Sequence, residues 1–247
     1  MNVLDNRTVA DYVIENIKTA PIFKKYGIDF CCKGNITINK VCQKNKINLN
    51  TLKSELENVE SVSDVLQDYN TWSLNFLTLY IENVHHSYVK ESLPIISQYI
   101  NEVIKTYGNT HPELLKINKL FRKASSEVLS HLQKEEQILF PYIKQLIAAN
   151  KGHKKISIPS FITIHTPIKM LEYEHEEINN LFREIAKLTD NYSIPESVSN
   201  TYKDLYIKLE EFEQDLYHHI HLEHNILHRK ALELEKKTNY YKKRRSV

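Results

Sequence analysis

Two histidine–glutamate pairs are the residues whose types and spacing best suit metal chemistry. His131 precedes Glu135 by four residues, and His219 precedes Glu223 by the same distance. In an α-helix this spacing places both side chains on one face, one turn apart. A single pair of this kind is more often a surface ion pair. Here, however, the two segments match at an offset of 88 residues, together with the Ile-Leu dipeptide that follows each, which indicates an internal repeat.

Two further histidines, His86 and His175, follow nearly the same repeat at a separation of 89 residues. In chain order the four histidines are separated by 45, 44 and 44 residues. In an up-and-down bundle this spacing returns each histidine to a comparable depth. Four imidazoles and two carboxylates that can bridge suit two transition metals, each with two histidines and the shared carboxylates. Iron is the first choice, and the ligand types leave manganese and zinc open.

Acidic residues one turn before three of these histidines could orient the imidazole rings. Each could accept a hydrogen bond from the ring nitrogen that does not bind metal. The alternative is an ordinary helix pair, and the sequence does not separate the two. Glu174, beside His175, is a further acidic candidate near the mouth of the site. The three candidates that precede His86, His131 and His219 are Glu82, Glu127 and Asp215, respectively.

The remaining histidines of the proposed site region have alternative interpretations. His85 and His218 are neighbours of proposed ligands and would exchange roles with them if the helical register slipped. Three later histidines face away from His219, at about 100° per residue. We expect this outer stripe to be a solvated face, with metal binding as the alternative. The outer stripe consists of His221, His224 and His228.

The cysteines are too few and too clustered for a disulfide framework. Cys31 and Cys32 are adjacent and precede Lys33 and a glycine. Adjacent cysteines form a disulfide only with strain, so the pair favours metal binding, thiol exchange or a bond between chains. Lys33 would assist if it lowered a thiol pKa. Buried structural cysteines are the alternative for this pair, and Cys42 is expected to be a core residue.

Helices must position these residues. The 247 residues include only 4 glycines and 7 prolines, fewer than the turns of a β or α/β chain require, which predicts an all-α fold. Apolar periodicity, a kink at Pro141 and a cap at Thr166 indicate four long helices with short connections, and hence an antiparallel bundle. The predicted helices span residues 72–106, 113–149, 166–188 and 196–237.

The start of the chain reads as a separate unit of short helices, with Asn48 as a helix cap. We predict a cysteine-bearing helical domain at 1–60, a linker at 61–71, a four-helix bundle at 72–240 and a basic tail at 241–247. A net charge of +2 argues against a dedicated nucleic-acid binder. Without an apolar stretch of roughly 20 residues or a signal-peptide core, we expect a cytoplasmic protein with no membrane partner.

Four segments of the sequence form a recognisable pattern: YGIDFCCKG at 26–34, HLQKEEQILFP at 131–141, YEH at 173–175 and HIHLE at 219–223. With these segments the chain resembles the di-iron iron-sulfur cluster repair proteins, which join a short cysteine-bearing domain to a hemerythrin-like bundle. In the family pattern the ligand of the first bundle helix lies eight residues before the proline of a Leu-Pro pair, which selects His86 over His85. His228 and Arg229 replace a Phe-Pro pair of that pattern.

This resemblance implies two non-heme irons bridged by Glu135 and Glu223, with an oxo or hydroxo bridge. It implies a stress-response protein that restores iron-sulfur clusters damaged by nitric oxide or oxidants, including by donating iron. The expected partners are damaged iron-sulfur proteins and the gases NO and O₂. Cys31 and Cys32 would serve in redox chemistry or iron handoff. The implied ligands are His86, His131, Glu135, His175, His219 and Glu223.

Three other functions are compatible with the same residues. The centre could reduce NO or peroxide with electrons relayed by the cysteines, or it could bind O₂ or NO reversibly as a sensor or carrier. A metal-free helical scaffold is the third. An exposed thiol unit on a linker would favour a homodimer, and a monomer remains open.

Overall fold

The structure, a computed structural model, describes residues 7–31, 33–59, 69–152 and 163–245. Within these residues every extended regular element is a helix, and one isolated antiparallel bridge joins Thr8 to Thr37. The predicted all-α fold is therefore confirmed. Most of the predicted linker lies outside the described residues, and its last part forms a short 3₁₀ turn, η2 (Tyr69–Thr71).

The N-terminal unit contains four short helices, joined in part by the 3₁₀ turn η1 (Ile17–Thr19). Asn48 caps the last of them, as predicted, because its side chain accepts hydrogen bonds from the backbone N–H groups of Asn50 and Thr51. At the opposite end, Thr8 and Asp11 form a capping box. The four helices are α1 (Val9–Glu15), α2 (Ala20–Lys25), α3 (Ile38–Asn45) and α4 (Leu49–Glu57).

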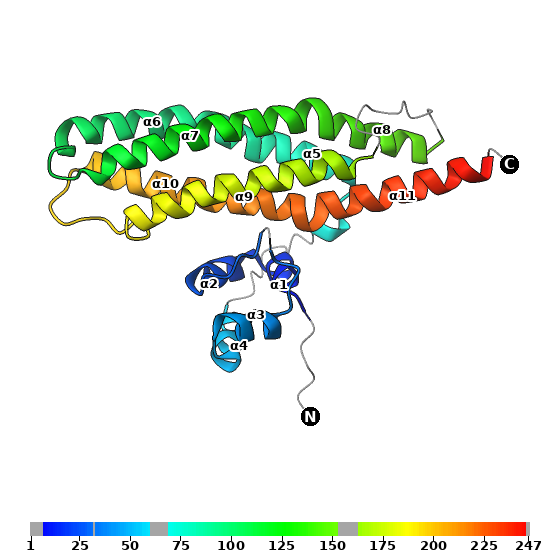
Figure 1. Cartoon of the computed structure of the whole chain (residues 1–247), viewed down its shortest axis with the longest axis horizontal. Coiled ribbons are helices and arrows are strands. Elements are labelled where there is room, and N and C mark those ends of the chain that lie inside the picture. Colours follow the sequence, from blue (N-terminus) through cyan, green and yellow to red (C-terminus); the bar gives the residue numbers. More distant parts are fainter. Residues whose placement is uncertain (1–6, 32, 60–68, 153–162, 246–247) are drawn as a thin grey trace.

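Four long helical rods form the bundle (Figure 1). Three of the rods contain a π-helical segment, in which the backbone forms wider turns than in an α-helix. The first rod is α5 (Leu74–Tyr80), the π segment η3 (Ile81–His86) and α6 (Ser87–Tyr107). The second is α7 (Glu113–Lys134), the π segment η4 (Glu135–Leu139) and α8 (Phe140–Asn150). The third is α9 (His165–Leu188). The fourth is α10 (Asn200–Leu222), the π segment η5 (Glu223–Leu227) and α11 (His228–Arg245).

Two predicted helix starts are wrong. Thr166 does not cap the third rod, because α9 begins one residue earlier and the N–H of Ile164 is held by the Glu235 carboxylate at 2.9 Å. The fourth rod begins at Asn200, where the Ser199 side chain caps the helix. At the other end α11 continues to Arg245, so most of the predicted basic tail is helical.

The bundle core is divided in two by a layer of polar residues. One apolar cluster joins α6, α7 and the greater parts of α9 and α10 to the N-terminal unit. The other joins α5, α8, the start of α9 and η5. In all four rods the buried histidines and glutamates of the predicted metal site lie between these two clusters. Apolar packing on both sides therefore fixes the depth of this polar layer.

The N-terminal unit lies against one flank of the bundle (Figure 1). Its Lys24 forms an ion pair with Glu213 of α10 at 2.5 Å, and Asp29 forms one with Arg183 of α9 at 2.9 Å. The apolar cores of the two parts are also continuous. Among the described helices, none is both long and apolar enough to cross a membrane.

Candidate metal centre

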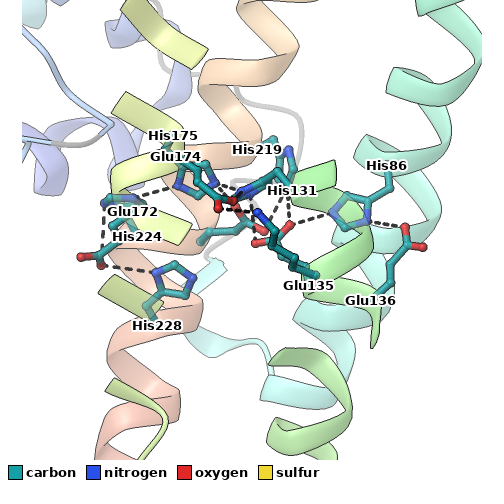
Figure 2. A network of polar contacts seen from close by, with 12 residues as sticks. His86, His131, Glu135, Glu136, Glu172, Glu174, His175, His219, His224 and His228 are labelled. Atoms are coloured by element: carbon teal, nitrogen blue, oxygen red, sulfur yellow. Dashed lines mark hydrogen bonds and ion pairs between the residues drawn. The ribbon is translucent and has the colours of Figure 1, made fainter. Parts of the chain in front are cut away.

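Six side chains of the predicted site converge between the rods (Figure 2). All six are at most 2% exposed, although every one is polar. Glu135 and Glu223 open the π segments η4 and η5, and His86 closes η3. The remaining three lie in α-helices: His131 in α7, His175 in α9 and His219 in α10.

These side chains form two overlapping groups of four potential ligands. One ligand atom from each member of a group lies within 4.8 Å of the other three. Both groups contain Glu135 and Glu223, so each carboxylate faces two clusters at once. The first group adds His86 and His219, and the second adds His131 and His175. The arrangement thus offers two cation positions with shared carboxylates.

The nitrogen–oxygen distances around the two carboxylates follow the same pattern in both halves of the bundle. Glu135 lies 3.4 Å from Nε2 of His86 and 3.4 Å from Nε2 of His131. Glu223 lies 3.1 Å from Nε2 of His175 and 3.0 Å from Nε2 of His219. Each carboxylate therefore has one imidazole from its own helix and one from the preceding rod.

Unpaired buried atoms test whether this cluster suits a cation. Among the described residues, both oxygens of Glu135 and of Glu223 are buried without a hydrogen-bond partner, as is Nε2 of His86 and of His219. Two fully buried carboxylates in the same groups of potential ligands are costly unless positive charge compensates them. Imidazole nitrogen and carboxylate oxygen are ligands of iron, zinc and manganese. The residues therefore fit a pair of transition-metal cations.

Burial and neighbouring charges shift the pKa values of the side chains in this cluster. Burial disfavours a charged ring at His131, but the carboxylates of Glu135 and Glu174 outweigh it and raise its pKa to about 10. At His175, burial and the charge of His131 lower the pKa to about 4. Burial and Glu223 oppose ionisation of Glu135, yet His131 and His86 keep its pKa below the usual value. Nε2 of His131 and Nε2 of His175 lie 2.7 Å apart, a distance at which one ring donates a hydrogen bond to the other.

The partners of the outer ring nitrogens differ from the sequence predictions. Nδ1 of His86 lies 2.8 Å from Oε1 of Glu136 in the second rod, so the predicted pairing of His86 with Glu82 is replaced by a contact between rods. Nδ1 of His131 lies 3.1 Å from Glu174, which also binds Lys134. The candidate near the site mouth therefore contacts a proposed ligand.

The other two acidic candidates have different partners. Glu127 forms an i,i+4 ion pair with Lys123 at 3.6 Å, a partner that was not predicted. Asp215 lies 2.9 Å from Nδ1 of His85, and the His85 ring stacks on His219 with 5.5 Å between centroids. His85 is thus outside both four-residue groups, and His86 is inside one.

Two polar neighbours of the centre were missed by the sequence analysis. Glu136 reaches His86 and also binds Lys90 at 2.7 Å. Nε2 of His224 lies 2.9 Å from Nδ1 of His175. Both contacts join different rods, and a pattern within one helix cannot reveal them.

The expectation that the outer stripe is a solvated face is wrong. His221 and His228 are each 1% exposed, and His224 is 10% exposed in its side chain. The prediction used the 100° advance of an α-helix, whereas η5 places more residues in each turn. Each residue of η5 therefore advances by less than 100°, which turns His224 and His228 toward α9.

Cys31 is buried against the bundle, contrary to the predicted exposed thiol unit; Cys32 lies outside the described residues. The Cys31 side chain is 2% exposed, and its Sγ accepts a hydrogen bond from Nδ2 of Asn179 at 3.5 Å. Nδ2 of Asn225 donates to the Cys31 carbonyl at 3.3 Å. Lys33 pairs with Glu176. Cys42 is a core residue, as predicted, and burial raises the pKa of its thiol.

The contacts of Cys31 place this residue near the candidate centre. Asn179 follows His175 by one helical turn, and Asn225 follows Glu223 by two residues. Cys31 is therefore anchored to two of the rods that carry proposed ligands.

Comparisons with known proteins agree with this division into two parts. Residues 5–60 match the model of a domain of unknown function (DUF542), and residues 79–231 match the hemerythrin HHE cation binding domain. An iron-sulfur cluster repair protein ScdA of Staphylococcus epidermidis is 32% identical over 226 residues, which cover 90% of this chain and 96% of the relative. An iron-sulfur cluster repair protein YtfE of Edwardsiella ictaluri is 28% identical, with 92% and 97% covered.

Proposed function

Because the chain belongs to the family of iron-sulfur cluster repair proteins, we propose that it restores damaged iron-sulfur clusters with a two-iron centre in its bundle. The family membership rests on matches along nearly the whole chain. The single observation that carries the two-iron centre is the pair of four-residue groups that share Glu135 and Glu223. The cation-binding character of the matched domain agrees with it.

In this proposal six residues of the chain hold the irons. Bound iron supplies redox-active cations that can accept small ligands such as NO or O₂ and can be donated to a damaged cluster. The four histidines give neutral imidazole nitrogens, and the two glutamates give bridging oxygens. The proposed ligands are His86, His131, Glu135, His175, His219 and Glu223.

The surrounding polar residues keep these ligands in place. Glu136, Glu174 and His224 hold the outer nitrogens of three ligand rings, which fixes the orientation of each ring. Apolar packing above and below the layer excludes bulk water. The centre is thus preorganised by hydrogen bonds from outside and by packing along the bundle axis.

Cys31 is proposed to act at the handoff of iron or in redox exchange, together with Cys32. The support for Cys31 is its anchorage to Asn179 and Asn225 beside the candidate centre. Because Cys31 is buried, its thiol must first become exposed before it can meet a client protein. Cys31→Ser is expected to leave the iron content unchanged and to slow cluster restoration.

The experiment that tests the proposal measures iron content and cluster restoration in the same preparations. Protein is loaded with Fe²⁺ without oxygen and mixed with an iron-sulfur dehydratase whose cluster has been damaged by NO. We expect two irons per wild-type chain and recovery of dehydratase activity. Glu135→Ala is expected to lose both the iron and the recovery.

Glu127→Ala is the matched control, because Glu127 lies two turns earlier in the same rod and pairs with Lys123. It should behave as the wild type. If Glu135→Ala kept two irons, the proposed centre would be rejected. If the loaded wild-type protein failed to restore the cluster while keeping its iron, the repair function would be rejected.

A further inference from the structure

We propose that two lysines at the surface of the bundle, Lys90 and Lys134, are positioning residues that set how firmly the proposed centre holds its cations. Each lysine pairs with a glutamate that also contacts the outer ring nitrogen of a proposed ligand. The inference rests on the two-iron centre proposed above. It adds that the lysines act on the bound cations through these glutamates.

In the first of these chains of contacts, one carboxylate oxygen meets two nitrogen atoms. Oε1 of Glu136 lies 2.8 Å from Nδ1 of His86 and 2.7 Å from Nζ of Lys90. Glu136 belongs to the second rod and lies on the outer side of His86 (Figure 2). Lys90 follows His86 by four residues in the first rod. The imidazole and the ammonium therefore share the charge of a single oxygen.

The second chain of contacts has the same order of residues. Oε2 of Glu174 lies 3.1 Å from Nδ1 of His131, and its Oε1 lies 2.5 Å from Nζ of Lys134. Lys134 follows His131 by three residues in the second rod, and Glu174 comes from the third rod. In both chains a carboxylate of the next rod joins a proposed ligand to a lysine one turn later.

These contacts bear on the strength of the bond between imidazole and metal. A carboxylate that accepts the outer N–H of a metal-binding imidazole makes the opposite ring nitrogen a stronger donor to the metal. An ammonium on the same carboxylate draws charge toward itself and away from the imidazole. Glu136 and Glu174 should therefore tighten the centre, whereas Lys90 and Lys134 should loosen it.

The other two proposed ligand rings have no carboxylate at their outer nitrogens. Nδ1 of His175 faces an imidazole, that of His224, and Nδ1 of His219 is buried without a hydrogen-bond partner among the described residues. Each four-residue group thus contains one ring with a carboxylate and a lysine behind it, which is His86 in one group and His131 in the other. Each lysine should consequently act mainly on one of the two cation positions.

The test measures the affinity of both positions for Fe²⁺. Protein is titrated with Fe²⁺ without oxygen in competition with a chromogenic Fe²⁺ chelator. Glu136→Gln keeps the shape of the side chain and should weaken one position by about tenfold or more. Lys90→Met keeps the aliphatic stem and should strengthen one position by about two- to fivefold, since the lysine side chain is 49% exposed. Lys134→Met should strengthen the other position.

Three further variants separate this role from a general effect of charge. Lys90→Arg retains the cation and should keep the wild-type affinities. Lys90→Met in the Glu136→Gln background should cause no further change, because the lysine then has no carboxylate through which to act. Lys123→Met is the matched control, because Lys123 pairs with Glu127 in the second rod and should leave both affinities unchanged.

Unchanged or weaker Fe²⁺ binding by Lys90→Met would overturn the proposal, because a purely structural lysine can only weaken the centre when it is lost. Equal strengthening by Lys90→Met with and without Glu136 would also overturn it and would indicate direct repulsion between the lysine and the cation. Two irons in the wild type with either result would leave the proposed centre intact. A wild-type protein that binds no iron would reject the proposed centre and this inference with it.

Discussion

At the scale of single residues, the two adjacent histidines at the end of η3 have different environments. His86 faces the shared carboxylate of Glu135 at 3.4 Å. His85 instead pairs with Asp215 and stacks on the ring of His219. Adjacent positions on a helix face different directions, so only one of the two histidines can contribute a nitrogen to the centre.

This difference gives a direct prediction for metal content. His86→Asn should lower the iron content to one per chain or less, because it removes a ligand from one four-residue group. His85→Asn should retain two irons and serve as the control. Iron is measured by atomic emission on protein loaded without oxygen. Loss of iron in the His85 variant alone would reverse the assignment.

Protonation of His131 gives a second prediction at this scale. Burial opposes its charge, but Glu135 and Glu174 raise its pKa to about 10, so the metal-free ring stays protonated as pH falls below that value. A cation can bind Nε2 only after this proton leaves. Loading near neutral pH should therefore release about one proton from the His131–His175 pair, and the apparent affinity should fall as pH falls.

Zn²⁺ titrations in two buffers with different ionisation enthalpies measure this release. The difference between the two binding enthalpies gives the number of protons transferred to the buffer. Equal enthalpies in both buffers at a pH of about 8 would show that the ring had already lost its proton.

The sequence was sufficient to identify the residues that face the candidate centre. It was insufficient to identify the residues that lie behind them. Four-residue spacing and the repeat singled out both carboxylates, because each lies one turn from a histidine of its own helix. Glu136 and His224 act across rods, where spacing along one helix carries no information.

At the scale of elements, the π segments determine which side chains enter the polar layer. Glu135 and Glu223 each open one, and these segments are related by the repeat offset of 88 residues. Wider turns at functional positions are a recurrent use of π-helix. Apolar periodicity predicted the rods because it needs only an approximate angle, and it missed the π segments because they alter that angle locally.

Helix capping in the N-terminal unit gives a prediction at the same scale. Asn48→Ala removes the acceptor for two N–H groups at the start of α4 and should destabilise the protein by about 1 kcal/mol. Asn50→Ala, two residues later, retains that acceptor and should not destabilise it. Urea unfolding followed by circular dichroism compares the two. Equal midpoints for Asn48→Ala and the wild type would contradict the role of the cap.

At the scale of the whole molecule, the N-terminal unit is held to the bundle by charges as well as by apolar contact. Glu213 is 1% exposed in its side chain, and its ion-pair partner Lys24 belongs to α2. The Lys24 ammonium also lies 5.5 Å from the ring centroid of Tyr192 and 5.7 Å from that of Tyr217. The sequence predicted the unit but not the surface of the bundle against which it packs, because no pattern within the unit identifies the surface of another domain.

Removal of the Lys24 ammonium should weaken the packing of the N-terminal unit against the bundle. Lys24→Met leaves the Glu213 carboxylate buried without its partner and should cost about 1–3 kcal/mol, allowing for the partial exposure of Lys24. The expected results are a lower urea midpoint and faster alkylation of Cys31, which is 2% exposed in the docked state.

Lys25→Met is the matched control for this prediction. The neighbouring Lys25 pairs with Glu55 inside the N-terminal unit and does not join it to the bundle. It should leave the alkylation rate of Cys31 unchanged. Equal rates for both variants would show that the pair with Glu213 does not hold the unit in place.

The two four-residue groups have a symmetry with a consequence for how cations leave. The first and second rods form one helical hairpin, and the third and fourth rods form the other. Exchange of the two hairpins converts one group into the other, and each group takes one histidine and one glutamate from each hairpin. Neither hairpin alone therefore completes either cation position. Separation of the hairpins would dismantle both positions in the same event, so the two cations would leave together. The number of cations that the protein retains would therefore measure how firmly its two hairpins are associated.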